Sequence, residues 1–325
     1  MNRPAQSFIQ LGRTLVDALP APAQGKVRDW LGHPGIRTIP LDSLDAELSR
    51  AALLFSSSED DARSLLQGFQ LELPGNRPPD PFSSEYRDWT WSLYRSISGH
   101  SEYSIANEAS PIDLERATVR PFPFETGSAT VVGGDLVARG HLMRCIGEAS
   151  LGLTPPARIV EFGPGWGNLT EDLVSTGFSV TAVEVDEQFC ELIRRRCPNP
   201  ELLTVTQEDM LDFDPDDQYD AAVFFESFHH CSDHLAMLKN LHRIVRPGGA
   251  VFFASEPVQK LNYPWGPRLD GLSVWSTRTY GWLELGFDTS YFETALSRTG
   301  WRGTRRSLGA GMGEPDVIVA VADSA

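Results

Sequence analysis

The stretch RIVEFGPGWGNLTEDL, Arg158 to Leu173, lies near the middle of the 325-residue chain and decides its fold. An apolar run ends in a segment with three alternating glycines, and a helical pattern follows at once. A strand that ends in a glycine loop and opens a helix leaves bare N–H groups at the positive helix end, where a polar or anionic ligand can approach the backbone. A tight structural turn is the alternative interpretation of the same glycines.

The spacing of the glycines narrows the choice of ligand. Dinucleotide-binding folds carry GxGxxG, whereas Gly163, Gly165 and Gly167 form GxGxG. Asn168 stands where the dinucleotide pattern has its third glycine, and no Gly-Lys-Ser/Thr follows, which excludes a P-loop. We expect Asn168 to be the N-cap of a helix that ends at Gly177.

From residue 157 onward, strand and helix signals alternate. Apolar strands are predicted at 157–162, 179–185, 201–207, 220–226 and 250–255, with helices after the first, second and fourth of them. A further helix is predicted near 289–299, and strands near 302–308 and 315–323. Such alternation is typical of a mostly parallel sheet with helices on both faces.

Acidic side chains follow successive strands of this predicted sheet. Glu184 ends the second strand, where a carboxylate can accept hydrogen bonds from both hydroxyls of a ribose. Asp209 and Met210 follow the third strand, where an acid can bind the amine of adenine and an apolar side chain can cover the ring. Glu161, just before the glycine loop, could orient that loop or meet an amino group. Carboxyl ends of parallel strands share one edge, so we expect one common site.

The sequence resembles the class I S-adenosylmethionine-dependent methyltransferases in VEFGPGWG, VTAVEVDE, QEDMLDF and LHRIVRPGGAVFF. The resemblance implies an α/β, Rossmann-like, seven-stranded and mostly parallel sheet whose last strand, PDVIVAVAD, is antiparallel. It implies S-adenosylmethionine as cofactor and S-adenosylhomocysteine as product. The three glycines would approach the methionine part, Glu184 would hold the ribose, and Asp209 with Met210 would frame the adenine.

Residues 159–213 also resemble the adenine dimethylases that modify ribosomal RNA. Those enzymes carry an Asn/Asp-Pro-Pro-Tyr motif after the fourth strand, and this chain has FFESFHHCSDH there. The formal charge of −16 also argues against a nucleic-acid partner, because phosphate binding needs a basic face. We therefore expect a small-molecule acceptor and no nucleic acid.

The same segment supplies candidate catalytic residues, namely His229, His230 and Glu226. Transfer of a methyl group to an alcohol is helped by a base, and histidine is the usual choice near neutral pH. Two alternatives remain: the histidines are structural loop residues, or they form a metal site with Asp233 and His234. Our expectation is that no metal is bound.

The chain is expected to contain two parts. Residues 1–130 are predicted as a mainly helical extension that caps the acceptor, with helical patterns near 5–19, 42–55, 60–70 and 84–98. Residues 131–325 would form the methyltransferase domain, with an aromatic lid at about 257–287. That lid could cover the acceptor, or pack on the extension or on a second subunit, so that a homodimer is one arrangement it allows.

The composition fits a globular cytoplasmic protein, with 41% hydrophobic and 22% charged residues. The four cysteines form no CxxC pair and are expected to be reduced thiols. No apolar stretch is long enough for a membrane span, and residues 8–19 form an amphipathic pattern rather than a signal peptide.

The acceptor is the least determined feature. The passage FPFETG, residues 122–127, together with EFGPGWGN resembles bacterial methyltransferases that accompany glycan-assembling enzymes. This resemblance ranks a sugar, glycan intermediate or similar hydroxyl first. A carbon- or nitrogen-methylating enzyme of small metabolites and a non-catalytic cofactor- or partner-binding module are the alternatives.

Overall fold

The computed structural model describes residues 36–109, 112, 114, 129–308 and 315–322. Contacts divide the chain into two compact units, residues 1–75 with 269–275 and residues 76–268 with 276–325. This division does not fall at the expected boundary near residue 130, because helix α5 (Ser84–Ser98) buries Tyr86 and Tyr94 in the core of the second unit. The patterns at 5–19 and 120–127 lie outside the described residues.

Over residues 36–75, the first unit contains helices α3 and α4 and a short parallel sheet. Its elements are β1 (Arg37–Ile39), η1 (Leu41–Ser43), α3 (Leu44–Phe55), α4 (Glu59–Gln67) and β2 (Phe69–Leu71). Ser58 caps α4 by accepting the N–H of Asp61. Helix α4 is shorter than the predicted 60–70, because the residues after Gly68 pair with β1 as strand β2.

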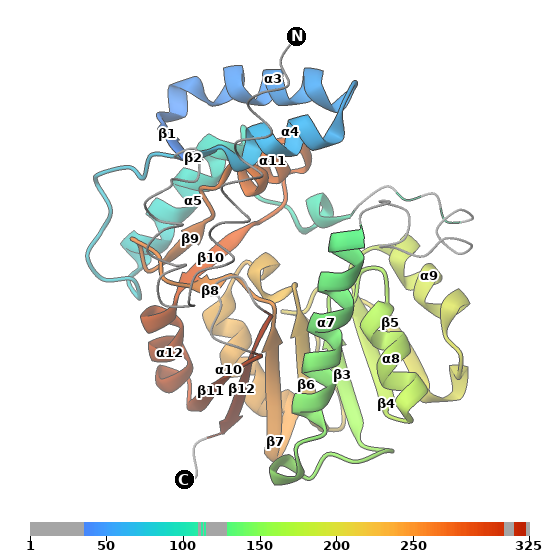
Figure 1. The fold of residues 1–325 in the computed structure, drawn as a ribbon. Coiled ribbons are helices and arrows are strands. Elements are labelled where there is room, and N and C mark those ends of the chain that lie inside the picture. Colours follow the sequence, from blue (N-terminus) through green and yellow to red (C-terminus); the bar gives the residue numbers. More distant parts are fainter. Residues whose placement is uncertain (1–35, 110–111, 113, 115–128, 309–314, 323–325) are drawn as a thin grey trace, which may run out of the picture. The chain divides into compact units, whose positions relative to one another are not determined.

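The second unit is built on a seven-stranded sheet of order β11-β12-β7-β6-β3-β4-β5 (Figure 1). The strands are β3 (Arg158–Phe162), β4 (Ser179–Glu184), β5 (Leu203–Gln207), β6 (Tyr219–Phe225), β7 (Val245–Ala254), β11 (Trp301–Ser307) and β12 (Asp316–Ala322). Strand β12 runs antiparallel to both of its neighbours, β11 and β7, and the other neighbouring pairs are parallel, which confirms the predicted Rossmann-like fold and its antiparallel last strand. The strand order reverses at β3, and ligands of such sheets bind beyond the carboxyl ends at that point.

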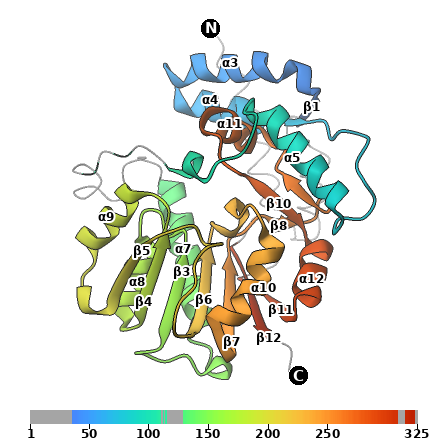
Figure 2. The same ribbon diagram turned by 180° about the vertical axis from the view of Figure 1, so that it is seen from behind.

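Helices cover both faces of this sheet (Figures 1 and 2). The elements are η2 (Ile105–Glu108), α7 (Ala129–Ile146), η4 (Ala149–Leu151), α8 (Asn168–Thr176), α9 (Glu187–Arg196), η5 (Pro200–Leu202), η6 (Phe228–His230), α10 (His234–Ile244) and α12 (Thr289–Arg298). Side chains of α7 and α8 share a buried cluster with one face, and those of α10 and α12 share another with the opposite face.

One of the two predicted ends of helix α8 agrees with the structure. Gly177 ends the helix in a left-handed conformation with φ of 98°, as predicted. The N-cap prediction was wrong, because Gly167, with φ of 73°, occupies that position and Asn168 is the first helical residue. The Asn168 side chain instead accepts a hydrogen bond from Arg196 at 2.9 Å. The chain thus enters the helix through a left-handed glycine, and no side chain caps this end.

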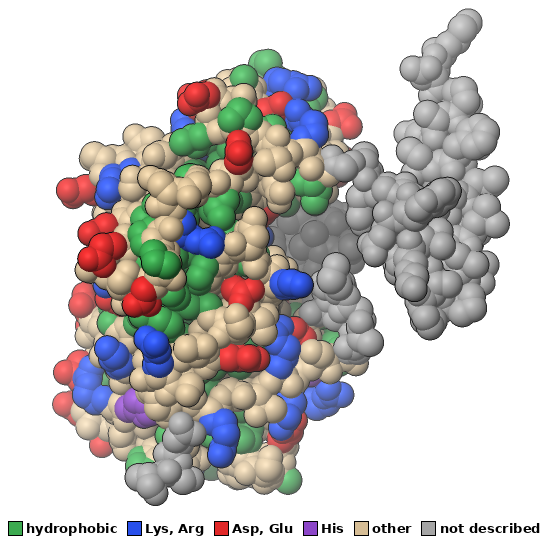
Figure 3. Space-filling view, turned by 90° about the vertical axis from the view of Figure 1, so that its left-hand side faces the viewer, with side chains coloured by type: hydrophobic (Ala, Val, Ile, Leu, Met, Phe, Trp, Pro, Cys, Tyr) green, Lys and Arg blue, Asp and Glu red, His purple; other side chains and the backbone are tan. Residues whose placement is uncertain are grey.

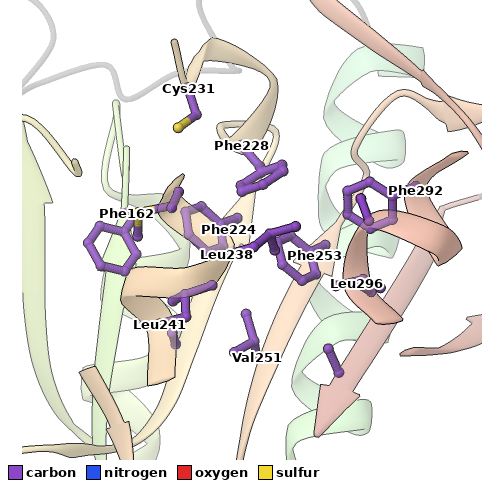
Figure 4. Close-up of a cluster of buried hydrophobic side chains, with 14 of the residues drawn as sticks. Phe162, Phe224, Phe228, Cys231, Leu238, Leu241, Val251, Phe253, Phe292 and Leu296 are labelled. Carbon is purple, nitrogen blue, oxygen red and sulfur yellow. The ribbon is translucent and has the colours of Figure 1, made fainter. Parts of the chain in front are cut away.

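A row of phenylalanines runs across the sheet below its carboxyl edge (Figure 4). Phe162, Phe224 and Phe253 occupy matched positions on β3, β6 and β7, and neighbouring rings stack at 5.0 and 5.3 Å. Phe228, in η6, packs edge-on against Phe224 and Phe253 at 5.1 and 4.8 Å. The buried Phe228 therefore fixes the turn that carries the two histidines after it.

The segment expected as an aromatic lid has regular structure. It contains β8 (Val258–Gln259), β9 (Trp265–Pro267), α11 (Gly271–Tyr280) and β10 (Leu285–Asp288), with a small sheet of order β8-β10-β9. Trp265 is buried and its Nε1–H donates to the carbonyl of Pro81 at 2.9 Å. Whether this segment moves stays a prediction.

Three further expectations concern the whole chain. All four cysteines are free thiols. Over the described ranges, no helix has the length and apolar character that a membrane crossing requires. On the face shown in Figure 3, acidic and basic side chains are interspersed rather than gathered into one basic surface.

Candidate functional site

The three glycines of the loop between β3 and α8 all have left-handed backbones, with φ of 63°, 50° and 73°. Two of them also have no room for a side chain. A Cβ on Gly163 would lie 2.7 Å from the Cβ of Ser227, and one on Gly167 would lie 2.7 Å from Cγ1 of Ile193. The first and third glycines therefore serve the packing of the loop itself.

Gly165 differs from the other two glycines. A Cβ built on it would meet no atom of the described residues within 4 Å beyond its chain neighbours, so the bare backbone is open with respect to them. Its N–H donates to Glu184 Oε2 at 2.9 Å. With respect to the described residues, a ligand could approach the backbone at the middle of the loop, and its binding there stays a prediction.

Glu184 fastens the end of β4 to the loop. Its Oε1 accepts the N–H groups of Val185 and Asp186 at 2.8 and 3.1 Å, while Oε2 accepts that of Gly165. Burial raises the pKa of this carboxyl, and the three amide hydrogen bonds oppose that rise. A carboxylate offers about four acceptor positions, so one remains on Oε2 for a ligand hydroxyl.

Glu161 is buried at the end of β3, and its Oε2 accepts the hydroxyl of Thr170 in α8 at 2.7 Å. Burial raises its pKa to about 7, because the charged form has lost its water. This contact joins strand and helix on the two sides of the glycine loop. That Glu161 orients the loop or meets an amino group of the ligand stays a prediction.

Asp209 and Met210 follow β5, the outer neighbour of β4, so they share the carboxyl edge with the loop and Glu184. Asp209 Oδ1 accepts the N–H of Leu211 at 2.9 Å, and burial raises its pKa. Met210 is partly buried against the main hydrophobic cluster. All seven residues expected to bind the cofactor therefore belong to the edge formed by β3, β4 and β5.

The neighbouring strands β6 and β7 end in an unusual way. Glu226 and Ser255 follow them directly, and both have left-handed backbones, with φ of 51° and 54°. No other non-glycine residue in the described ranges has a positive φ. Such a backbone costs roughly 1–2 kcal/mol at each residue, and this kind of strain gathers at functional sites.

His229 is held by a buried carboxylate that the sequence analysis did not select. Glu256 Oε2 lies 2.8 Å from His229 Nδ1 and also accepts the backbone N–H of His229. Its Oε1 accepts the N–H groups of Ser227 and Phe228, both at 2.8 Å. Burial would raise the pKa of Glu256, but the histidine and the amides outweigh it and lower that pKa. Glu256 is therefore ionised and Nδ1 of His229 donates to it, which leaves Nε2 as the ring nitrogen that can accept a proton.

His230 has a different environment, although it is the next residue. Its Nδ1 lies 3.0 Å from Glu108 Oε2, and Glu108 Oε1 accepts the hydroxyl of Tyr103 and the N–H of Leu283. Burial lowers the pKa of His230, but Glu108 outweighs it and raises the pKa to about 9. His230 is thus a cation at neutral pH and has no lone pair to act as a base.

The four residues considered as metal ligands have separate partners. Asp233 accepts Arg87 at 2.6 Å and the N–H of Ala236, which makes it the N-cap of α10. His234 Nε2 pairs with the hydroxyl of Tyr291 at 2.6 Å. Within the part of the chain that the structure describes, no three His, Cys, Asp or Glu side chains are grouped so that they could hold a metal ion.

A cavity of about 470 Å³ opens beside the histidines. The side chains around it are almost all polar or charged, and they come from the ends of β6 and β7 and from the segment after them: Glu226, His229, His230, Ser255, Pro257, Gln259 and Arg268. Glu284 stands between two of them, with its Oε2 3.8 Å from His229 Nε2 and 3.7 Å from Arg268. All three candidate catalytic residues thus line one cavity.

Sequence reasoning missed three carboxylates of this site. Glu256 follows the fifth predicted strand, and the rule that selected Glu184 would also have selected it. Glu108 and Glu284 gave no such signal, because they reach the histidines from segments more than 50 residues away along the chain.

The seven-stranded sheet with helices on both faces is a Rossmann-like fold. Residues 160–253 match the family model described as a methyltransferase domain. An uncharacterised methyltransferase of Bacillus cytotoxicus is 31% identical over 98 residues, which cover 30% of this chain and 45% of that protein. The ribosomal RNA small subunit methyltransferase A of Bifidobacterium adolescentis is 34% identical over 93 residues, or 25% of this chain and 30% of that protein.

The chain thus spans less than half the length of these curated relatives. Among solved structures, a complex of DhpI with SAH is similar at a TM-score of 0.46 and 18% identity, over 65% of this chain and 96% of that one.

The residues at the edge of β3, β4 and β5 fit S-adenosylmethionine. The open space over Gly165 admits a ligand against the backbone, and Glu184 keeps one acceptor position for a ribose hydroxyl. Asp209 and Met210 supply an acid and an apolar surface one strand further along.

Proposed function

We propose that the protein is an S-adenosylmethionine-dependent methyltransferase that methylates a hydroxyl group of a small polar acceptor, with a sugar hydroxyl as the first candidate. The observation that carries this proposal is the pairing of His229 with Glu256 at the wall of a polar cavity. When bound, S-adenosylmethionine supplies an electrophilic methyl group and is converted to S-adenosylhomocysteine.

The role proposed for His229 is that of a general base. The acceptor hydroxyl gives its proton to His229 Nε2 as its oxygen takes the methyl group. Glu256 keeps the ring oriented through Nδ1 and stabilises the imidazolium that results, and Glu284 lies 3.8 Å from the nitrogen that gains the proton. His230 and Glu226, the other two candidates, line the cavity and contact the acceptor in this proposal.

The rest of the site supports transfer to a hydroxyl of a polar molecule. Methyl transfer is an in-line displacement, so the acceptor must be aligned with the donor and water excluded. The cavity wall is rich in carboxylate, hydroxyl, amide and guanidinium groups, which suit a polyhydroxylated acceptor.

The test is incubation of the full-length protein with methyl-labelled S-adenosylmethionine and a panel of sugars, polyols, amines and RNA. We expect label on oxygen, located by NMR of the product. His229→Ala should lose transfer, while the exposed His100→Ala serves as a matched control and should not. Label on RNA alone, or on nitrogen with equal rates for both variants, would contradict the proposal.

A further inference from the structure

The acidic groups around the cavity are not alike in their pairing. Glu256 binds His229, Glu108 binds His230, and Glu284 lies 3.7 Å from Arg268. The side chain of Glu226 lines the same cavity, but no hydrogen bond or ion pair joins it to any described residue. Of the four carboxylates, Glu226 is thus the one that no hydrogen bond or ion pair joins to a described cation, and Arg268 acts on it only through its charge.

Two further polar side chains of the cavity are without partners. Among the described residues, neither the Ser255 hydroxyl nor the Gln259 amide forms a hydrogen bond. Together with Glu226 they place a carboxylate, a hydroxyl and an amide in the cavity, and these groups are exposed or half-buried. They are therefore available to an acceptor, whereas His230 and Arg268 already have Glu108 and Glu284 beside them.

Electrostatics at Glu226 favour a positive ligand. Although part of the residue is exposed, burial of its carboxyl raises the pKa to about 7; the charges of Glu256 and Asp135 add to the rise, and that of Arg268 opposes it. The cavity therefore carries more negative than positive charge when Glu226 is ionised. A cation beside Glu226 would relieve this repulsion, and a neutral ligand would not.

The backbone keeps Glu226 and Ser255 at this place in spite of its cost. Both residues have φ near +50°, a conformation that favours glycine. The N–H of Glu226 donates to the carbonyl of Ala254, and that of Ser255 donates to the carbonyl of Asp316, at 3.0 and 2.9 Å. Neighbouring strands thus hold both strained residues in position.

We propose that the acceptor carries a protonated amino group near its reacting hydroxyl, as an amino sugar or amino alcohol does, and that Glu226 binds this amine. Ser255 and Gln259 bind hydroxyl groups of the same acceptor. The inference rests on the proposed function in one respect, that this cavity receives the acceptor. Beyond that function, the inference assigns a positive charge to the acceptor and names Glu226 as the residue that selects for this charge.

The first experiment measures binding without turnover. The full-length protein, saturated with S-adenosylhomocysteine, is titrated at neutral pH with glucosamine, N-acetylglucosamine and glucose, and the shift in thermal melting temperature is recorded. Glucosamine should stabilise the wild type more than the other two sugars. The difference should disappear in Glu226→Gln and persist in Glu293→Gln, a control at an exposed residue of α12. Equal shifts for all three sugars would overturn the inference.

The second experiment measures labelled methyl transfer to aminated, N-acetylated and hydroxylated forms of each acceptor that is methylated. Glu226→Gln should lower kcat/KM at least tenfold more for the aminated form than for the other two, and Glu293→Gln should change none of the three. Faster transfer to the neutral forms would contradict the inference that the acceptor carries an amine, but it would leave the proposed methyltransferase function standing. Selective binding of amines without methyl transfer to any acceptor would contradict the proposed methyltransferase function, but it would support a cavity that binds an amine.

Discussion

The carboxyl edge of the sheet has two halves that are built by different means. At the ends of β3, β4 and β5, the important contacts are between near neighbours in the chain and use backbone groups, as in the three amides on Glu184. At the ends of β6 and β7, the contacts are between side chains from distant segments, as in His230 with Glu108. In our proposal, the first half binds a cofactor that is common to many enzymes, and the second binds one particular acceptor.

We call the ends of β3, β4 and β5 the cofactor half of the edge and the ends of β6 and β7 the acceptor half. The largest loss of activity is expected for substitutions in the acceptor half. His229→Ala should lower kcat by about 10²–10⁴-fold, because the proton of the acceptor loses its base. Glu256→Gln should lower kcat as well and should also destabilise the protein, since the turn of η6 loses a carboxylate that accepts three amides.

The measurement is single-turnover transfer of labelled methyl, with unfolding by denaturant in parallel. His230→Ala should retain more activity than His229→Ala, because His230 is a cation and not a base. Equal losses in the two histidine variants would contradict the assignment.

The next effect tests the cofactor half. Gly165→Ala should fold with only the cost of its left-handed backbone, roughly 1–2 kcal/mol, yet bind S-adenosylhomocysteine at least tenfold more weakly, because its methyl group enters the open space over the loop. Gly167→Ala has the same backbone cost and also collides with Ile193, so it should lose more stability. Calorimetry and denaturant unfolding measure the two quantities. A Gly165→Ala variant with normal affinity would show that no ligand approaches this backbone.

A smaller effect is expected at the end of β4. Glu184→Ala should weaken cofactor binding by about 1–3 kcal/mol, because a ribose hydroxyl would lose its acceptor. The loop would also lose its tie through the N–H of Gly165. Calorimetry with S-adenosylhomocysteine measures the loss, and adenine alone, which has no ribose, should bind the variant and the wild type more nearly alike.

The smallest effect concerns a histidine that lies behind the acceptor half. Burial lowers the pKa of His234 to about 3, with Asp233 opposing and Arg87 assisting. Between this value and the ordinary 6.5, the unfolded chain binds more protons at this residue than the folded one. The free energy of unfolding should therefore fall with falling pH, by at most about 1.4 kcal/mol per unit. Urea unfolding should show a shallower pH dependence in His234→Gln, and identical slopes would contradict the assignment.

The two halves also differ in how far the sequence predicts them. The strands, the glycine loop and Glu184 were predictable, because each depends on a short pattern with a fixed meaning. Asn168 was assigned as a cap because it is a good capping residue, but Gly167 already supplies the turn. The roles of His229 and His230 could not be separated by sequence, since the carboxylates that distinguish them, Glu256 and Glu108, approach from opposite directions along the chain.

Glu256 has a consequence for attempts to redesign the protein. One carboxylate holds both the turn of η6 and the imidazole of His229, so a library that varies position 256 would be dominated by misfolded members. Positions 226, 255 and 259 have no such structural role, because their side chains form no hydrogen bond or ion pair with the described residues. Randomising these three alone would let new acceptors be selected while the proton-accepting apparatus stays intact.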